Sequence, residues 1–90
     1  MKTIEQNMLR AIDARKNWKS GNTRVCVTDD GQIQILLHGN EIASGYDGKL
    51  YLNRYTLARW PTVTTKSRLR ALGFDITQKA YQIYIDGEKL

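Results

Sequence analysis

The sequence has 90 residues, enough for one compact domain over residues 1–90, and its 41% hydrophobic and 26% charged residues are typical of a folded protein. It contains no apolar run long enough for a membrane span, no segment typical of a secretory signal, and one cysteine, which excludes an internal disulfide. The formal net charge of +5 is compatible with a polyanionic partner.

The charges are segregated along the chain. Residues 25–47 contain four acidic and no basic residues, whereas residues 48–74 contain six basic and no acidic residues. This segregation predicts a surface that binds a polyanion. The alternative is a solvated surface on which the acidic and basic segments meet in the fold, and the sequence leaves both interpretations open.

The first expected element is a helix from Thr3 to Trp18. Thr3 and Gln6 have the spacing of a capping box, in which the threonine oxygen accepts a free backbone N–H. Gly21 suits the left-handed residue that ends many helices. Apolar residues recur at helical spacing and form one stripe: Ile4, Met8, Leu9, Ala11 and Ile12.

The middle of the chain alternates apolar and polar residues, which predicts a meander of antiparallel strands from Val25 onward. The segment Lys49–Leu57 is the expected last strand of this meander. Glycine, asparagine and aspartate tolerate the positive φ of tight turns, so pairs of them mark the connections between strands. The expected turns are Asp30-Gly31, Gly39-Asn40 and Asp47-Gly48.

A second, shorter helix is expected after Pro61, which favours extended backbone at the residue before it. The pattern predicts this helix over Lys66–Leu72, with a threonine as its N-cap and Gly73 at its end. The candidate capping residues are Thr62, Thr64 and Thr65.

Together these elements predict an α+β fold, in which an antiparallel sheet of four to five strands has an N-terminal helix and a short second helix packed on one face. A last strand, Tyr81–Ile85, is expected to join this one sheet. The predicted core consists of Ile4, Met8, Ile12, Val25, Val27, Ile33, Ile35, Leu37, Leu50, Leu52, Leu69, Leu72, Ile83 and Ile85.

Two blocks of the sequence carry a resemblance to a known group of proteins. They are Leu37–Ala43 (LHGNEIA) and Trp60–Leu72 (WPTVTTKSRLRAL). The blocks resemble the pattern L-H-G-N-x-I-A followed by W-x-T-x-T-T-x-x-R-L-x-A-L, which occurs in small uncharacterised proteins of tailed bacteriophages. Arg70 departs from this pattern, which often has asparagine at that position. The resemblance implies a phage-encoded accessory protein in the cytoplasm of the bacterial host, and it implies no activity.

The second block also predicts an anion site. Free backbone N–H groups at a helix start can bind an anion, and basic side chains follow at once. The candidate residues in this block are Thr64, Thr65, Lys66, Arg68 and Arg70. Lys66 and Arg70 are four residues apart and share a helix face, and Arg54 and Arg59 lie on the strand expected before the helix. The alternative is that the threonines only cap the helix.

Exposed tyrosines support a nucleic-acid partner. If Leu50 and Leu52 face the core, Tyr51 lies on the opposite face of the sheet, and the same argument places Tyr84 there. Such a face, with glutamines and flanking arginines, can stack and hydrogen-bond the bases of single-stranded DNA or RNA. The alternative is a phage effector that binds and inhibits or redirects a bacterial host protein, since tyrosine, tryptophan and arginine are enriched at interface hot spots.

The sequence predicts no enzyme, no cofactor and no metal site. Cys26 and His38 are the only cysteine and histidine, and together they supply two metal ligands at most. A Cys–His nucleophilic pair on adjacent strands is conceivable, but a strand cysteine and a turn histidine are the better explanation. Asp29 and Asp30 occupy an expected turn, and there is no glycine-rich phosphate loop.

Overall fold

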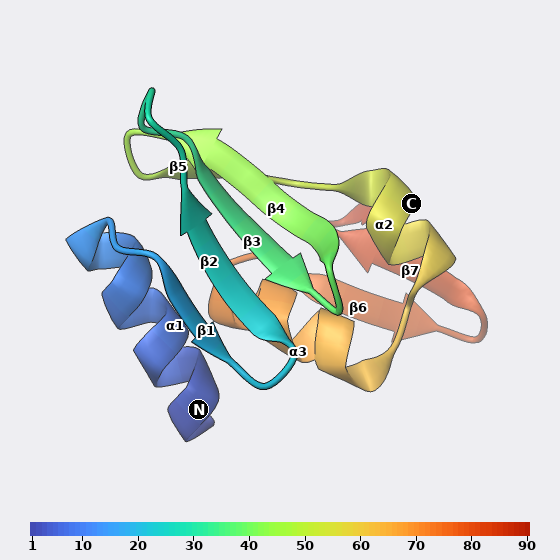
Figure 1. Cartoon of the computed structure of the whole chain (residues 1–90). Helices are drawn as coiled ribbons and strands as arrows, with labels where there is room; N and C mark the ends of the chain where they lie inside the picture. The colour runs from blue at the N-terminus through green and yellow to red at the C-terminus, as the bar shows by residue number, and fades with distance from the viewer.

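The computed structural model describes residues 1–90 and contains three helices and eight strands (Figure 1). The strands form two antiparallel sheets. The expected α+β class is therefore confirmed. In chain order the elements are α1 (Thr3–Ala14), β1 (Trp18–Ser20), β2 (Thr23–Val27), β3 (Ile33–Leu37), β4 (Asn40–Tyr46), β5 (Lys49–Leu52), α2 (Arg54–Arg59), α3 (Val63–Ala71), β6 (Ile76–Lys79), β7 (Gln82–Ile85) and β8 (Glu88–Lys89).

Strands β1 to β5 form one meander in the order β1-β2-β3-β4-β5, with each strand antiparallel to the next. The turn between β3 and β4 has positive φ at His38 and Gly39, and the turn between β4 and β5 has positive φ at Asp47 and Gly48. Two residues of positive φ match the right-handed twist of a hairpin. The sequence correctly predicted hairpin turns here, although the first is centred one residue earlier than expected.

The core lies between the five-stranded sheet and the helices α1 and α3. Alternate residues of the sheet face this core, so that Val25, Ile35 and Ala43 are paired across three strands and all fully buried. Every residue of the predicted core is buried or half-buried. The structure adds Leu57 and Ile76, which the predicted core did not include.

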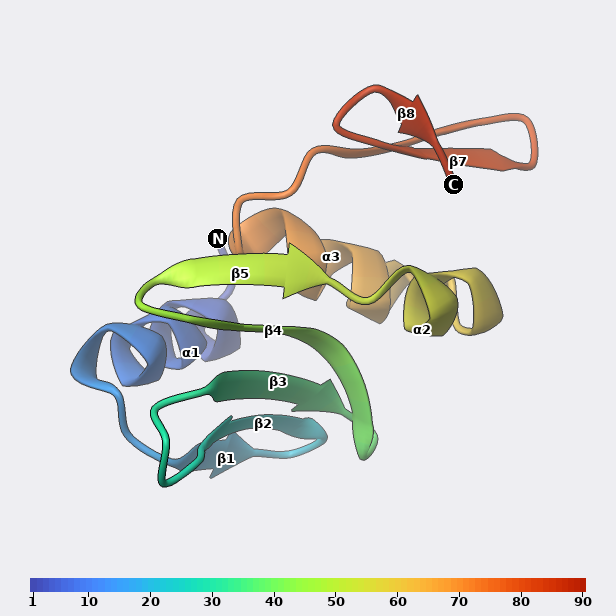
Figure 2. The same ribbon diagram turned by 90° about the horizontal axis from the view of Figure 1, so that it is seen from above.

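The last strand does not join the main sheet, contrary to expectation. It is β7, and it pairs with β6 and β8 in a separate three-stranded sheet. Figure 2 shows this small sheet on the far side of α3, so that α3 lies between the two sheets. Ile76 and Ile85 are paired across β6 and β7 and are buried in the common core.

The N-terminal helix is shorter than expected and begins differently. Lys2 occupies the N-cap position and makes no side-chain capping bond, so the predicted capping box does not form. The helix ends at Ala14, because Arg15 adopts the left-handed conformation with φ of 53°. The residues that follow form β1, which gains backbone hydrogen bonds by pairing with β2.

A helix replaces the second half of the expected strand Lys49–Leu57. The strand β5 ends at Leu52, and the side chain of Asn53 then accepts a hydrogen bond of 3.0 Å from the backbone N–H of Thr56. This N-cap starts α2, which turns Leu57 into the core. Arg54 and Arg59 consequently lie on a helix and not on a strand.

The second predicted helix is confirmed as α3, although it begins three residues earlier than expected. Thr62 is its N-cap, and its Oγ1 accepts from the backbone N–H of Thr65 at 3.1 Å. At the other end Gly73 has a φ of 104°, and Phe74 donates its backbone N–H to Leu69 in a Schellman arrangement. None of the three helices is both long and apolar enough to cross a bilayer.

Candidate functional site

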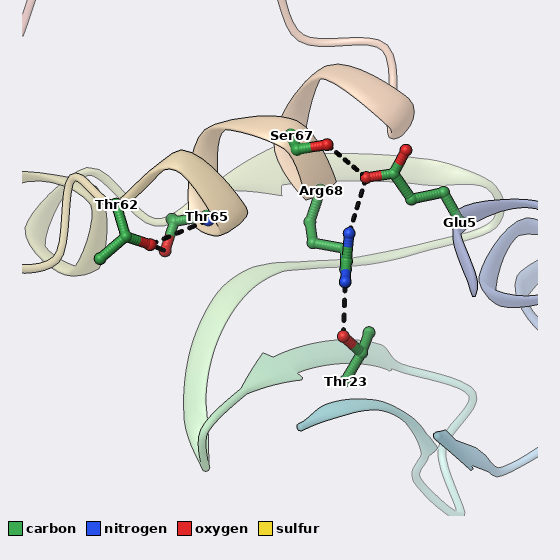
Figure 3. A network of polar contacts seen from close by, with 6 residues as sticks. All are labelled: Glu5, Thr23, Thr62, Thr65, Ser67 and Arg68. Carbon is green, nitrogen blue, oxygen red and sulfur yellow. Dashed lines mark hydrogen bonds and ion pairs between the residues drawn. The ribbon is translucent and has the colours of Figure 1, made fainter. Parts of the chain in front are cut away.

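Arg68, one of the predicted anion-binding residues, lies inside the protein (Figure 3). Its Nη1 donates to the Glu5 carboxylate at 2.8 Å, and its Nε donates to the hydroxyl of Thr23 at 3.1 Å. Ser67 donates a further hydrogen bond of 2.6 Å to the same carboxylate oxygen. We call these four residues the buried ion-pair network. Because Arg68 joins α3 to α1 and β2 there, it is not available to an external polyanion.

The network also changes the acidity of Glu5. Burial alone raises the pKa of this carboxyl, but hydrogen bonds from Ser67 and Arg68 and the positive charge of Arg68 outweigh it. The pKa of Glu5 is therefore lower than its ordinary value near 4.5. The carboxylate stays charged at neutral pH and compensates the guanidinium beside it.

The remaining polar residues of the second block mostly hold α3 in place. Lys66 donates from Nζ to Oε1 of Gln78 at 2.8 Å, and Arg70 donates from Nε and Nη2 to the carbonyl of Ile76 at 2.9 and 2.7 Å. Both contacts attach α3 to β6. Thr65 is buried, with its hydroxyl 2.8 Å from that of Thr62, and Thr64 is half-buried. These contacts favour the alternative interpretation, in which the threonines serve the helix start.

The predicted open face with two tyrosines does not form, because Tyr51 lies on β5 and Tyr84 on β7, in different sheets. Tyr51 is exposed, and Lys49 lies over its ring at 5.5 Å, whereas Tyr84 is half-buried.

The strand register also separates Cys26 and His38, the possible nucleophilic pair. Cys26 faces Gln34 across the β2–β3 ladder, and the backbone of His38 bonds to Asn22 beyond its end.

A groove between α2 and β7 brings other aromatic residues together. It has a volume of about 470 Å³, and we call it the aromatic groove. Its lining residues are Arg54, Tyr55, Ala58, Pro61, Tyr81, Gln82, Ile83 and Leu90. Tyr55 and Tyr81 are 71% and 99% exposed, so both rings are open to a partner. The sequence interpretation missed them, since it placed Tyr55 on the expected strand Lys49–Leu57 and Tyr81 on the expected last strand.

One arginine of the predicted site, Arg54, lines this groove, and a second, Arg59, contacts Tyr55 of its wall. Nη2 of Arg54 is 3.4 Å from Oε2 of Glu88, in an ion pair that is exposed to solvent. Nη1 of Arg59 donates to the hydroxyl of Tyr55 at 3.4 Å, and its guanidinium lies 5.4 Å from the ring centre of Trp60. Arg54 and Arg59 are therefore the predicted cations that the structure places beside exposed aromatic rings.

A second hollow brings together the two blocks that carry the resemblance. It has a volume of about 200 Å³, and we call it the motif cavity. The first block supplies Leu37, His38, Asn40 and Ile42 to its wall, and the second supplies Trp60, Thr62 and Thr65. Thr56 of α2 completes the lining. Segments about 20 residues apart in the sequence thus meet around one cavity.

The chain is a phage protein. A family model described as the Kyanoviridae Gp96 protein matches residues 1–90, and the chain belongs to this family. The sequence resemblance to phage proteins is thereby confirmed. No curated protein and no solved structure matches the chain significantly.

Proposed function

We propose that this phage protein acts by binding and not by catalysis, and that its ligand is single-stranded nucleic acid held in the aromatic groove. The observation that supports this most is the exposure of Tyr55 and Tyr81 in one open groove, with Arg54 and Gln82 in its wall. We place this activity in the cytoplasm of the bacterial host, where phage nucleic acid is replicated and transcribed.

The groove offers the three kinds of contact that single strands use. The rings of Tyr55 and Tyr81 stack bases, which is worth about 1–3 kcal/mol per base. The side-chain nitrogen of Gln82 already donates to the carbonyls of Ile83 and Leu90 at 3.0 and 3.4 Å, so its amide oxygen is the group that can accept a hydrogen bond from a base edge. Arg54 and Arg59 attract the phosphates, and the release of counterions makes such binding sensitive to salt.

The existing partner of Arg54 does not prevent this role. Its ion pair with Glu88 is long and solvent-exposed. Exposed pairs of this kind contribute only about 0–1 kcal/mol, so a phosphate can replace the carboxylate at small cost.

Fluorescence anisotropy of labelled single-stranded DNA and RNA, measured at several salt concentrations, tests the proposal. Tyr55→Ala and Tyr81→Ala should each weaken binding between about fivefold and one-hundredfold. Tyr51→Ala is the matched control, because Tyr51 is an exposed tyrosine outside the groove. Absence of binding by the unaltered protein at low salt would overturn the proposal.

A second candidate is a surface that binds a bacterial host protein. Trp60 and Val63, which are close in the chain to Pro61 of the groove, also have exposed apolar side chains. Aromatic residues and arginine are enriched at interface hot spots. Capture from bacterial lysate that survives both nuclease and high salt would favour this partner, since phosphate-driven binding survives neither.

A further inference from the structure

The motif cavity is too small for a typical drug-sized ligand and differs in chemistry from the aromatic groove. Its volume of about 200 Å³ is below the range of roughly 300–1,000 Å³ for such ligands. Leu37 and Ile42 form an apolar, buried part of the wall, and Trp60 is a half-exposed ring beside it. The space therefore fits a single small ring system better than a whole nucleotide.

The polar groups of the cavity are amide, hydroxyl and imidazole groups. His38 comes from the β3–β4 turn and Asn40 from the start of β4, and the hydroxyl of Thr62, which already bonds to the backbone N–H and the hydroxyl of Thr65, comes from the start of α3. No carboxylate, ammonium or guanidinium group lines the wall. Burying a charge without a partner is costly, so this lining selects a neutral group with hydrogen-bonding edges.

The cavity adjoins the aromatic groove through one short segment. Pro61 lines the groove, whereas its chain neighbours Trp60 and Thr62 line the cavity. A strand that crosses Pro61 can thus present one unstacked base to the cavity while other bases stay on Tyr55 and Tyr81. Bases of single strands are commonly recognised in this way, by stacking on an aromatic ring and hydrogen bonding at the base edge.

We infer that the motif cavity binds one nucleobase, which stacks on Trp60 and offers its edge to Asn40, His38 and Thr62. The inference rests on the proposed function where the base belongs to a bound strand. A free nucleoside carries the same chemistry, so the experiment must separate these two sources.

Trp60 provides a direct signal for the test. The chain has two tryptophans, and the other, Trp18, lies on β1 outside the cavity. Titration with uridine, cytidine, adenosine and guanosine should quench the Trp60 fluorescence to saturation. Trp60→Phe keeps a stacking ring but removes the signal, and its remaining Trp18 fluorescence should not respond. Equal quenching of Trp60→Phe, or quenching that never saturates, would overturn the inference.

Asn40 is the position for blocking the cavity, because it lies at the exposed start of β4 and also lines the wall. Asn40→Phe should abolish saturable quenching and weaken oligonucleotide binding by about tenfold or more. Asn40→Ala removes the amide without filling the space. It should reduce nucleoside quenching and oligonucleotide binding less than Asn40→Phe does. Thermal melting of both variants and of Tyr51→Ala checks that the fold is intact, and a nucleoside response unchanged in folded Asn40→Phe would overturn the inference.

The two assays also separate this inference from the proposed function. Oligonucleotide binding that depends on Tyr55 and Tyr81, without any nucleoside quenching, overturns the cavity inference and leaves the groove intact. Saturable nucleoside quenching without oligonucleotide binding supports the cavity with a free nucleoside as its ligand, and it overturns the proposed groove function.

Discussion

The buried ion-pair network contains one arginine–glutamate pair, and Arg54 in the wall of the aromatic groove forms another with Glu88, but the two pairs differ in environment. The Arg68 and Glu5 side chains are 9% and 6% exposed and 2.8 Å apart, whereas those of Arg54 and Glu88 are 51% and 78% exposed and 3.4 Å apart. A buried pair cannot exchange its partner without leaving a charge in the core. An arginine in an exposed pair can exchange its carboxylate for another anion. Only the aromatic groove therefore combines such an arginine with exposed aromatic rings for recognition.

The largest effect is expected from breaking the buried pair. Arg68→Ala leaves the Glu5 carboxylate buried without its cation, which should lower the free energy of unfolding by about 3–5 kcal/mol. Chemical denaturation followed by circular dichroism measures this loss. Arg54→Ala is the control and should change stability by about 1 kcal/mol at most. Similar losses in the two variants would show that the two environments are equivalent, contrary to the structure.

The helix beside the groove should also depend on one buried anchor. Leu57→Ala removes a fully buried side chain of α2 and should lower the free energy of unfolding by about 2–5 kcal/mol. Ala58→Ser, on the exposed side of the same helix, is the control and should change it by less than about 0.5 kcal/mol. Denaturation midpoints that do not move in Leu57→Ala would contradict the placement of α2.

The buried network should make the protein sensitive to acid. The pKa of Glu5 is lower in the folded than in the unfolded chain. Between these two pKa values the unfolded state therefore binds more protons than the folded state. The stability from this carboxylate is complete above its unfolded pKa and is lost as the pH falls through the folded pKa. Hydrogen bonds from Thr28 and Tyr46 lower the pKa of Asp30, which adds to the same trend.

Melting temperatures measured from neutral pH down to about pH 3 test this acid sensitivity. Glu5→Gln should begin with a lower melting temperature and then lose less of it on acidification than the unaltered protein. Asp30→Asn provides the comparison at the surface. An identical acid-induced decrease in Glu5→Gln would show that the Glu5 carboxylate does not contribute.

The smallest effects are expected at the exposed pair, and they should appear in binding more than in stability. Glu88→Gln frees Arg54 and should strengthen oligonucleotide binding at low salt while changing stability by less than about 1 kcal/mol. Arg54→Gln should weaken binding and reduce the log–log salt slope by about 0.7–0.9. Anisotropy titrations give both quantities. Unchanged salt slopes would remove Arg54 from the phosphate path.

The sequence predicted the features that depend on neighbouring residues. The hairpin turns, a threonine N-cap for α3 and the Gly73 end of α3 are signalled within four or five residues, although the sequence left the cap open among Thr62, Thr64 and Thr65. The start of α2 was also a local feature, but its signal was the single capping side chain of Asn53, and the alternation from Lys49 to Leu52 suggested that the strand continued.

The remaining features depend on contacts between distant segments. The local sequence predicts Arg68 as an exposed cation, because its partner Glu5 lies 63 positions earlier and only the fold brings the two together. The division into two sheets is equally non-local, because β7 has the same alternation whichever sheet it joins. The groove also depends on that division, since Tyr81 lies in the turn between β6 and β7 of the small sheet, where it is exposed.

The ion pair between Glu5 and Arg68 has a consequence for the order of folding during synthesis. The hairpins of β2 to β5 are local and can form as soon as their residues leave the ribosome, while α1 lacks the charged partner of its buried glutamate. That partner is made only after three quarters of the chain. The first helix to be synthesised is therefore expected to dock among the last, and until then its apolar stripe is open to chaperones or to other nascent chains.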